Sequence, residues 1–271
     1  MTHLIVAHFQ SSNNAAQASV AQLLHAQTGG LLLKPCPFDV NGDPGGKRAC
    51  QTESKNALED HYCTMMTSPR GGIIDVSPED RNPMIAFIQA RRHVLIELKT
   101  IIVSVSPDTA SQQAAIEALT AICAAGVGPA CIRILGTDLP ADARFEDAYP
   151  AVTEYAREAQ ITILPEAVLP VSTSLTKAQQ FKIPFAAVLN RAVDFETELT
   201  AARLNGAPEK IVHALAHKVI AQRDLLDTAD AFKRVADALG LPCISQDEWR
   251  AECMPTTNRK RVRTMTLDQQ L

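Results

Sequence analysis

The chain has 271 residues, of which 46% are hydrophobic and 21% charged, and this is the composition of a globular protein long enough to bury a full core. Its net charge of −4 excludes binding to nucleic acid through an overall positive charge, although a local basic segment remains compatible. No apolar run approaches the roughly 18 residues of a membrane span, no signal peptide is visible, and the seven cysteines form no Cys-x-x-Cys pair. We therefore expect a soluble cytoplasmic protein.

Short apolar runs alternate with helical patterns over the first two-thirds of the chain, which is typical of a parallel sheet. The expected strands are 3–9, 31–34, 72–75, 100–106, 130–135 and 161–164. The expected helices are 15–27, 80–97, 109–125 and 143–159. The run Ile101–Val105 is almost entirely apolar, as in a strand that is covered on both faces. The sequence thus predicts an α/β fold with a mostly parallel sheet and helices on both faces, as in P-loop NTPases.

The remaining segments have other patterns. Residues 39–72 are rich in Gly, Pro, Asp and Asn and predict a loop region with one short helix at Glu53–Glu59. Helical spacing over 190–239 is interrupted at Gly206-Ala207-Pro208, which predicts two helices there. The predicted organisation is an α/β core at 1–189, a helical C-terminal region at 190–249 that packs on it, and a basic tail at 250–271.

The segment between the first strand and the first helix is the most informative part of the sequence. A strand, a tight polar loop and a helix form the architecture of a phosphate-binding P-loop. The loop 10–19 contains neither glycine nor lysine, and no lysine precedes Lys34. The alternative is an ordinary polar turn in which an asparagine caps the helix.

In the order of its parts the chain resembles the ParA/MinD-type deviant Walker ATPases, whose first loop reads Lys-Gly-Gly-x-Gly-Lys-[Ser/Thr]. The resemblance places Ser12 at the signature lysine, Gln17 at the phosphate-binding lysine and Ala18 at the hydroxyl that binds Mg²⁺. The nucleotide-binding residues that it implies are Asn13, Asn14, Ala15, Ala16, Gln17, Ala18 and Ser19.

Two carboxylates fit the same resemblance as catalytic candidates. Asp39, in Phe38–Pro44, matches the segment that orders the attacking water. Asp75, in Ile73-Ile74-Asp75-Val76-Ser77-Pro78, matches the Walker B aspartate that holds Mg²⁺ through water. The alternatives are a solvent-exposed loop carboxylate for Asp39 and a helix N-cap for Asp75. The segment Pro107-Asp108-x-x-Ser111 resembles the start of the next helix of these ATPases.

The replaced residues have direct chemical consequences. Without the lysine, the charge that stabilises the β- and γ-phosphates is gone, so we expect catalysis to fall by orders of magnitude. Asn13 and Asn14 tolerate positive φ angles, so the loop shape can survive, whereas Ala15 and Ala16 crowd it. Weak binding of ATP or ADP with Mg²⁺ through loop amides and the helix dipole stays open.

Two further motifs carry alternatives. The tail residues Arg259, Lys260, Arg261 and Arg263 either contact DNA phosphates without sequence preference, as basic C-terminal surfaces of the related ATPases do, or form a solvated tail. His213 and His217 have metal-ligand spacing on one helix, but the sequence shows neither the glutamate of His-Glu-x-x-His nor a third ligand.

These patterns favour a pseudo-ATPase that binds protein partners of a plasmid partition or conjugative transfer complex, and DNA. One alternative is an active ATPase in which Lys47, Arg48 or a partner subunit supplies the missing charge. Another is a structural assembly scaffold. A homodimer without the signature lysine would need another surface, such as the apolar stripe of 211–239.

Overall fold

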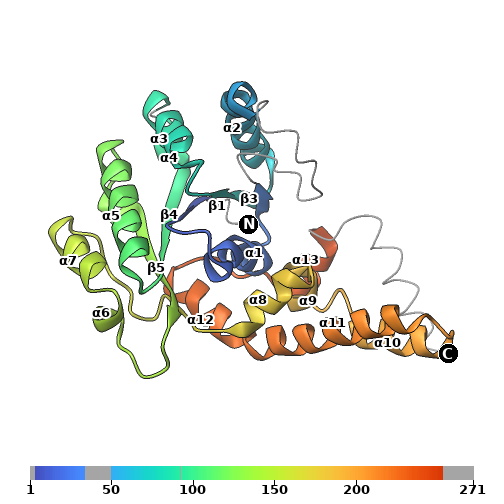
Figure 1. Ribbon diagram of the computed structural model, residues 1–271. Helices are drawn as coiled ribbons and strands as arrows, with labels where there is room; N and C mark the ends of the chain where they lie inside the picture. The colour runs from blue at the N-terminus through green and yellow to red at the C-terminus, as the bar shows by residue number, and fades with distance from the viewer. Residues whose placement is uncertain (1–3, 34–49, 92, 253–271) are drawn as a thin grey trace.

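The computed structural model describes residues 4–33, 50–91 and 93–252 and has a six-stranded sheet in which all paired strands are parallel (Figure 1). The strand order is β2-β3-β1-β4-β5-β6. The strands are β1 (Leu4–Gln10), β2 (Leu31–Leu33), β3 (Gly71–Val76), β4 (Leu98–Val105), β5 (Ile132–Leu139) and β6 (Val168–Pro170). Helices cover both faces of this sheet, which confirms the predicted fold class.

The strand order determines which helix covers which face. The chain passes from β1 through α1 (Ala15–Thr28) to the edge strand β2, and every later crossover runs in the opposite direction across the sheet. Because such crossovers are right-handed, α1 lies on one face and the later crossover helices lie on the other (Figure 1). These are α2 (Cys50–Thr67), α3 (Arg81–Ala90), α4 (Val94–Glu97), α5 (Thr109–Ala124), α6 (Phe145–Ala148) and α7 (Pro150–Glu158), with a 3₁₀ turn at Pro129–Cys131.

Helices that follow the sheet in sequence lie on the side of α1 (Figure 1). They are α8 (Thr173–Gln180), α9 (Phe185–Leu189), α10 (Phe195–Leu204), α11 (Glu209–Asp227), α12 (Ala229–Ala238) and α13 (Gln246–Glu252). Alternate side chains of β1 separate the two cores: Ile5 and Phe9 pack among the α2–α7 helices, and Val6 packs with α1 and the C-terminal helices. One crossover helix cannot cover a six-stranded sheet, so α8, α9, α11 and α12 complete this second core.

The prediction of a strand at 161–164 is wrong, because the backbone of Ile161 forms the C-terminal cap of α7. The Ile161 N–H donates to the Ala156 carbonyl at 2.8 Å, and Gln160 before it has a φ of 57°. This is the arrangement of a Schellman motif at the end of α7. The sixth strand is β6, at Val168–Pro170.

Three helix predictions also need correction. The expected short helix at Glu53–Glu59 is the 18-residue helix α2, whose residues Leu58, Tyr62 and Met65 recur at helical spacing and are buried. The expected helix 80–97 is divided into α3 and α4. The expected helix 143–159 is divided into α6 and α7, and Pro150 stands at the first position of α7.

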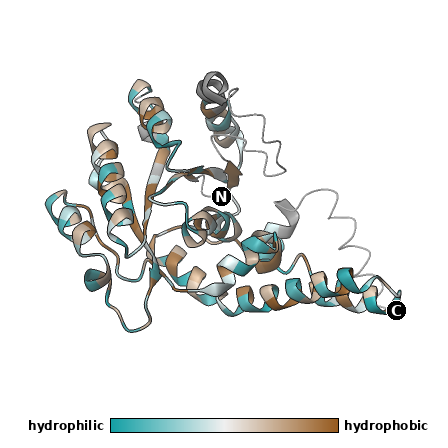
Figure 2. Cartoon of the chain, in the orientation of Figure 1, coloured by the Kyte–Doolittle hydropathy of each residue, from teal (hydrophilic) through white to brown (hydrophobic). Residues whose placement is uncertain are grey.

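Most of the apolar stripe of 211–239 is core rather than a free surface. Val219, Leu225 and Phe232 are buried in the second core, whereas Ile211 and Ile220 are about half exposed. The predicted interruption at Gly206 is confirmed, with a φ of 64°, but the single helix expected after it is divided at Thr228 into α11 and α12. α10 and α11 form a hairpin that extends away from the sheet (Figure 1). Figure 2 shows that α11 mixes hydrophilic and hydrophobic residues along its length, as expected for a helix with one buried side.

Within the described ranges, no helix is both long and apolar enough to cross a membrane. Four of the cysteines lie in these ranges with described side chains, Cys63, Cys123, Cys131 and Cys243, and all four are free thiols. Neither observation contradicts the expectations drawn from composition.

We predict that Leu225→Ala lowers the free energy of unfolding by about 2–5 kcal/mol, because it leaves a cavity in the second core, where α11 packs on α8 and α9. Leu225 is 0% exposed, and Leu204 on the same hairpin is 82% exposed. The matched variant Leu204→Ala should change stability by less than about 0.5 kcal/mol. Urea unfolding of both variants measures the difference; equal losses would show that the C-terminal helices do not form this core.

Candidate functional site

The candidate site lies where the carboxyl ends of β1, β3, β4 and β5 meet the beginning of α1. β1 stands between β3 and β4, and the direction of the crossovers reverses at this strand. In open α/β sheets, this reversal point is the usual place of a ligand site. Residues 11–14 connect β1 to α1 here.

The side chain of Gln17 fills the centre of this loop. Gln17 is 0% exposed, and its Oε1 accepts hydrogen bonds from the backbone N–H groups of Ser11 at 2.8 Å and Ser12 at 2.9 Å. The Ser104 hydroxyl also donates to Oε1, at 3.2 Å. The Gln17 Nε2 group donates to Ser11 Oγ at 2.9 Å and to Ser106 Oγ at 3.0 Å. The amide of Gln17 therefore holds two backbone donors at the start of the loop, immediately before the positions 13–19 that the resemblance assigns to nucleotide binding.

Asn14 caps α1, as the alternative interpretation of the loop predicted. Its φ and ψ of −84° and 161° are extended, and its Oδ1 accepts from the Gln17 N–H at 2.8 Å. No residue of the segment 11–14 has a positive φ. The left-handed conformations that Asn13 and Asn14 could have adopted are therefore absent, and the loop does not keep the shape of a P-loop.

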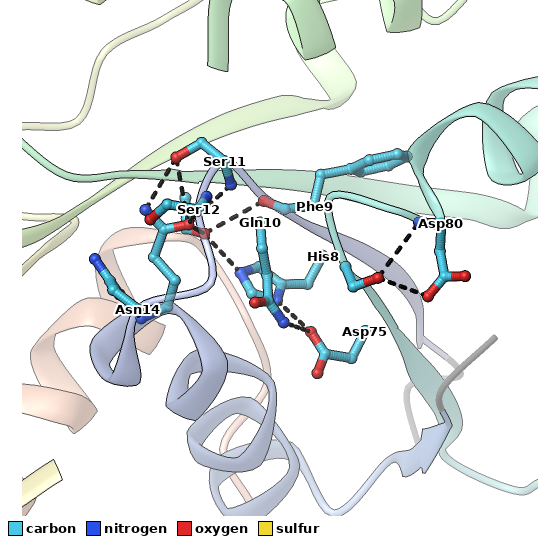
Figure 3. Close-up of polar contacts among 11 residues, drawn as sticks. His8, Phe9, Gln10, Ser11, Ser12, Asn14, Asp75 and Asp80 are labelled. Atoms are coloured by element: carbon cyan, nitrogen blue, oxygen red, sulfur yellow. Dashed lines mark hydrogen bonds and ion pairs between the residues drawn. The ribbon is translucent and has the colours of Figure 1, made fainter. Parts of the chain in front are cut away.

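His8, Asp75 and Ser104 form a buried chain of hydrogen bonds beneath the loop. His8 Nδ1 lies 3.0 Å from Asp75 Oδ1, and His8 Nε2 lies 3.1 Å from Ser104 Oγ. Figure 3 shows His8 and Gln10 directed at Asp75, and the Gln10 amide donates to the same Oδ1 at 2.8 Å. The Ser104 hydroxyl carries one hydrogen, so it donates to only one of His8 Nε2, Gln17 Oε1 and the Phe9 carbonyl at a time.

The three side chains are connected as in a Ser-His-Asp catalytic triad, but the serine and the histidine are not accessible to a substrate. His8 and Ser104 are both 0% exposed, and Ser104 Oγ also lies within hydrogen-bond distance of Gln17 and of the Phe9 carbonyl. A catalytic serine must reach its substrate. The described arrangement therefore acts as a buried structural network and not as a hydrolase centre.

Asp75 is close to the carboxyl end of β3, where the resemblance places a magnesium-binding aspartate. Its residue exposure is 4%, and His8 and Gln10 occupy its Oδ1. The alternative role of Asp75 as a helix N-cap is wrong, because the residue that precedes α3 is Asp80. Asp75 instead accepts two donors from β1 and joins β3 to β1 through side chains.

Carboxylates surround the exposed side of the loop. Asn13 Nδ2 donates to Glu79 at 2.9 Å, and Asn14 Nδ2 donates to Asp138 at 3.2 Å. The hydrogen bond from Asn13 lowers the pKa of Glu79. Burial raises the pKa of Asp138, although hydrogen bonds from Ser106, Thr137 and Asn14 oppose this shift. Negative charge at both positions disfavours a phosphate at this helix terminus.

The residues present do not fit ATP with Mg²⁺. Gln17 occupies the loop amides, Ala18 has no hydroxyl, and the carboxylate of Asp75 is enclosed. Ser19 does not restore the missing ligand, since its hydroxyl donates to the Ala15 carbonyl at 2.7 Å and accepts from Gln179 on α8. Ala16 is buried in the second core.

The structure thus brings Asn13, Asn14, Gln17 and Asp75 together, whereas the Ser19 hydroxyl bonds to Ala15 and to Gln179 on α8. Asp39 and the basic residues Arg259, Lys260, Arg261 and Arg263 lie outside the described residues. Sequence reasoning missed His8, Ser104 and Ser106. The available signal was a polar residue between two apolar ones in a strand, as His8 is between Ala7 and Phe9 and Ser104 is between Val103 and Val105.

No protein-family model matches this chain, and a search of curated proteins finds no match to it. The fold places the chain among α/β proteins with a parallel sheet, and its functional interpretation depends on the geometry of the loop and on the resemblance of its motifs.

We predict that Gln17→Met destabilises the fold by about 1–3 kcal/mol for each buried donor that loses its acceptor. Methionine matches glutamine in length, but it offers no strong acceptor to the Ser11 and Ser12 N–H groups. Urea unfolding tests this, with Gln113→Met, an exposed glutamine on α5, as the control. An equally small effect of both changes would contradict the role given to Gln17.

Proposed function

We propose that this protein is a pseudo-ATPase of the ParA/MinD type, a cytoplasmic binding module in plasmid maintenance or conjugative DNA transfer. In this proposal it retains the sheet and the loop position of such ATPases and has lost their nucleotide-driven switch. The observation that carries the proposal is the Gln17 amide, whose Oε1 accepts from the Ser11 and Ser12 N–H groups at 2.8 and 2.9 Å.

The electrostatics of the loop support the same conclusion. A nucleotide-binding loop concentrates positive potential on the phosphates through its lysine, its amides and the helix dipole. Here the charged side chains that hydrogen-bond to Gln10, Asn13 and Asn14 are the carboxylates of Asp75, Glu79 and Asp138. A triphosphate would have to displace an internal ligand and approach these negative charges.

A binding module acts through surfaces that do not need hydrolysis. The partners proposed here are proteins of a partition or transfer complex and the phosphate backbone of DNA, which the basic residues at 259–263 would contact. The alternative of an active ATPase would take its missing charge from Lys47 or Arg48, which lie outside the described residues, or from a partner.

We predict that calorimetric titration with ATP or ADP, with and without Mg²⁺, gives no saturable heat up to millimolar nucleotide. The physical reason is that binding must first break the hydrogen bonds of Gln17. Turnover of ATP that requires Mg²⁺ and disappears in Asp75→Ala would contradict the pseudo-ATPase and favour a rebuilt site.

We predict that the protein retards duplex DNA of arbitrary sequence in an electrophoretic mobility-shift assay. The logarithm of the binding constant should fall against the logarithm of the salt concentration with a slope of about 0.9 per phosphate contact. A variant with glutamine at 259, 260, 261 and 263 should bind more weakly and with a smaller slope. The control removes four charges from exposed positions elsewhere, with glutamine in place of Arg157, Arg203, Lys233 and Arg234. Equal binding by both variants would show that the tail does not contact DNA. If the parent protein does not bind DNA at all, the result would favour a structural scaffold that binds no DNA.

A further inference from the structure

We propose that His213 and His217 on α11 form a surface site for a borderline divalent cation, Zn²⁺, Ni²⁺ or Cu²⁺. The site is separate from the loop at α1 and does not depend on the proposed function. Neutral imidazole is a preferred ligand of these three ions.

The helix places both imidazoles on one accessible face. Residues four positions apart on an α-helix are neighbours, with Cβ atoms about 5–6 Å apart. His213 and His217 are both exposed, and 72% of the His213 side chain is accessible. They lie on the hairpin of α10 and α11, which extends away from the sheet (Figure 1). An ion can therefore reach both rings without any rearrangement of the fold.

The orientation of His217 is already restricted. Its ring stacks on Phe181, with 5.1 Å between centroids and 8° between planes. Stacking covers one face of the imidazole, whereas its nitrogens lie at the ring edge, where a metal binds. A restricted ring loses less side-chain entropy when it becomes a ligand.

The charged residues nearest to the pair on α11 are Glu209, which favours a cation, and Lys210 and Lys218, which oppose one. Glu209 stands one turn before His213, and its Oε1 lies 3.6 Å from His213 Nε2. The ammonium of Lys218, the nearest lysine in sequence to His217, is held 5.3 Å from the centre of the Phe195 ring. A carboxylate that faces one ring nitrogen of an imidazole strengthens metal binding through the other nitrogen, which for His213 is Nδ1.

The coordination at this site is open. The described part of the chain contains no group of three His, Cys, Asp or Glu side chains arranged to hold a metal. Two imidazoles therefore supply two positions, and water completes the others. An open site of this kind binds less tightly than a closed structural site with four protein ligands.

The test is calorimetric titration of the untagged full-length protein with Ni²⁺ and Zn²⁺. We expect one ion per chain, and at least about tenfold weaker binding in His213→Ala and in His217→Ala, because each leaves a single imidazole. Alanine suits an exposed helical position, so both variants should keep the parent circular dichroism spectrum.

Two control variants distinguish a chelating pair from the mere presence of histidine. Lys210→His combined with His213→Ala keeps the number of imidazoles but separates the pair by seven residues, about 10 Å along the helix, and should bind as weakly as His213→Ala. His93→Ala removes an exposed imidazole elsewhere and should bind as the parent does.

Binding by thiols or by other histidines would be shared by all of these proteins. If the parent, His213→Ala and His217→Ala bind Ni²⁺ and Zn²⁺ equally, or if the parent binds neither ion, the proposed site is overturned.

Discussion

The hydrogen bonds from the Ser11 and Ser12 N–H groups to the Gln17 side chain are the interaction on which the site depends. Backbone donors between a strand and a helix need acceptors when they are shielded from water. In a nucleotide-binding loop the phosphate is that acceptor, so the loop is complete only with its ligand. Here a residue of α1 is the acceptor, and the loop is complete without one. This is the physical basis of the proposed loss of a nucleotide-driven switch.

Beneath the loop, polar side chains join the carboxyl ends of neighbouring strands. Asp75 from β3, His8 from β1 and Ser104 from β4 bond in sequence, and Gln17 links Ser104 to Ser106. Such a buried network stabilises only when its members are satisfied, because a half-broken one leaves uncompensated polar groups. The same burial that satisfies these groups withholds the histidine and the serine from any substrate. Burial of His8 and Ser104 therefore both stabilises the network and keeps these side chains from contacting a substrate.

Elements formed by interactions between residues close in sequence could be predicted, whereas features that depend on contacts between distant residues could not. Helix α1 and the central strands β1 and β4 could be predicted because their apolar spacing is local. The apolar run at Ile161 was misread because a strand and the end of a helix look alike over four residues, and only the bond to Ala156 separates them. Gln17 could be recognised as a substitute for lysine, but its contact with Ser104 could not, since 87 residues separate them.

The direction of the crossovers also has a consequence for synthesis of the chain. Every connection after β2 adds its helix to one face, so the opposite face gains only α1 until the sheet is finished. The C-terminal residues that cover it, from Leu175 to Leu241, all follow the last strand in the sequence. A nascent chain therefore displays an apolar sheet surface until the helices after β6 emerge, and a chaperone that shields such surfaces would be needed mainly during that interval.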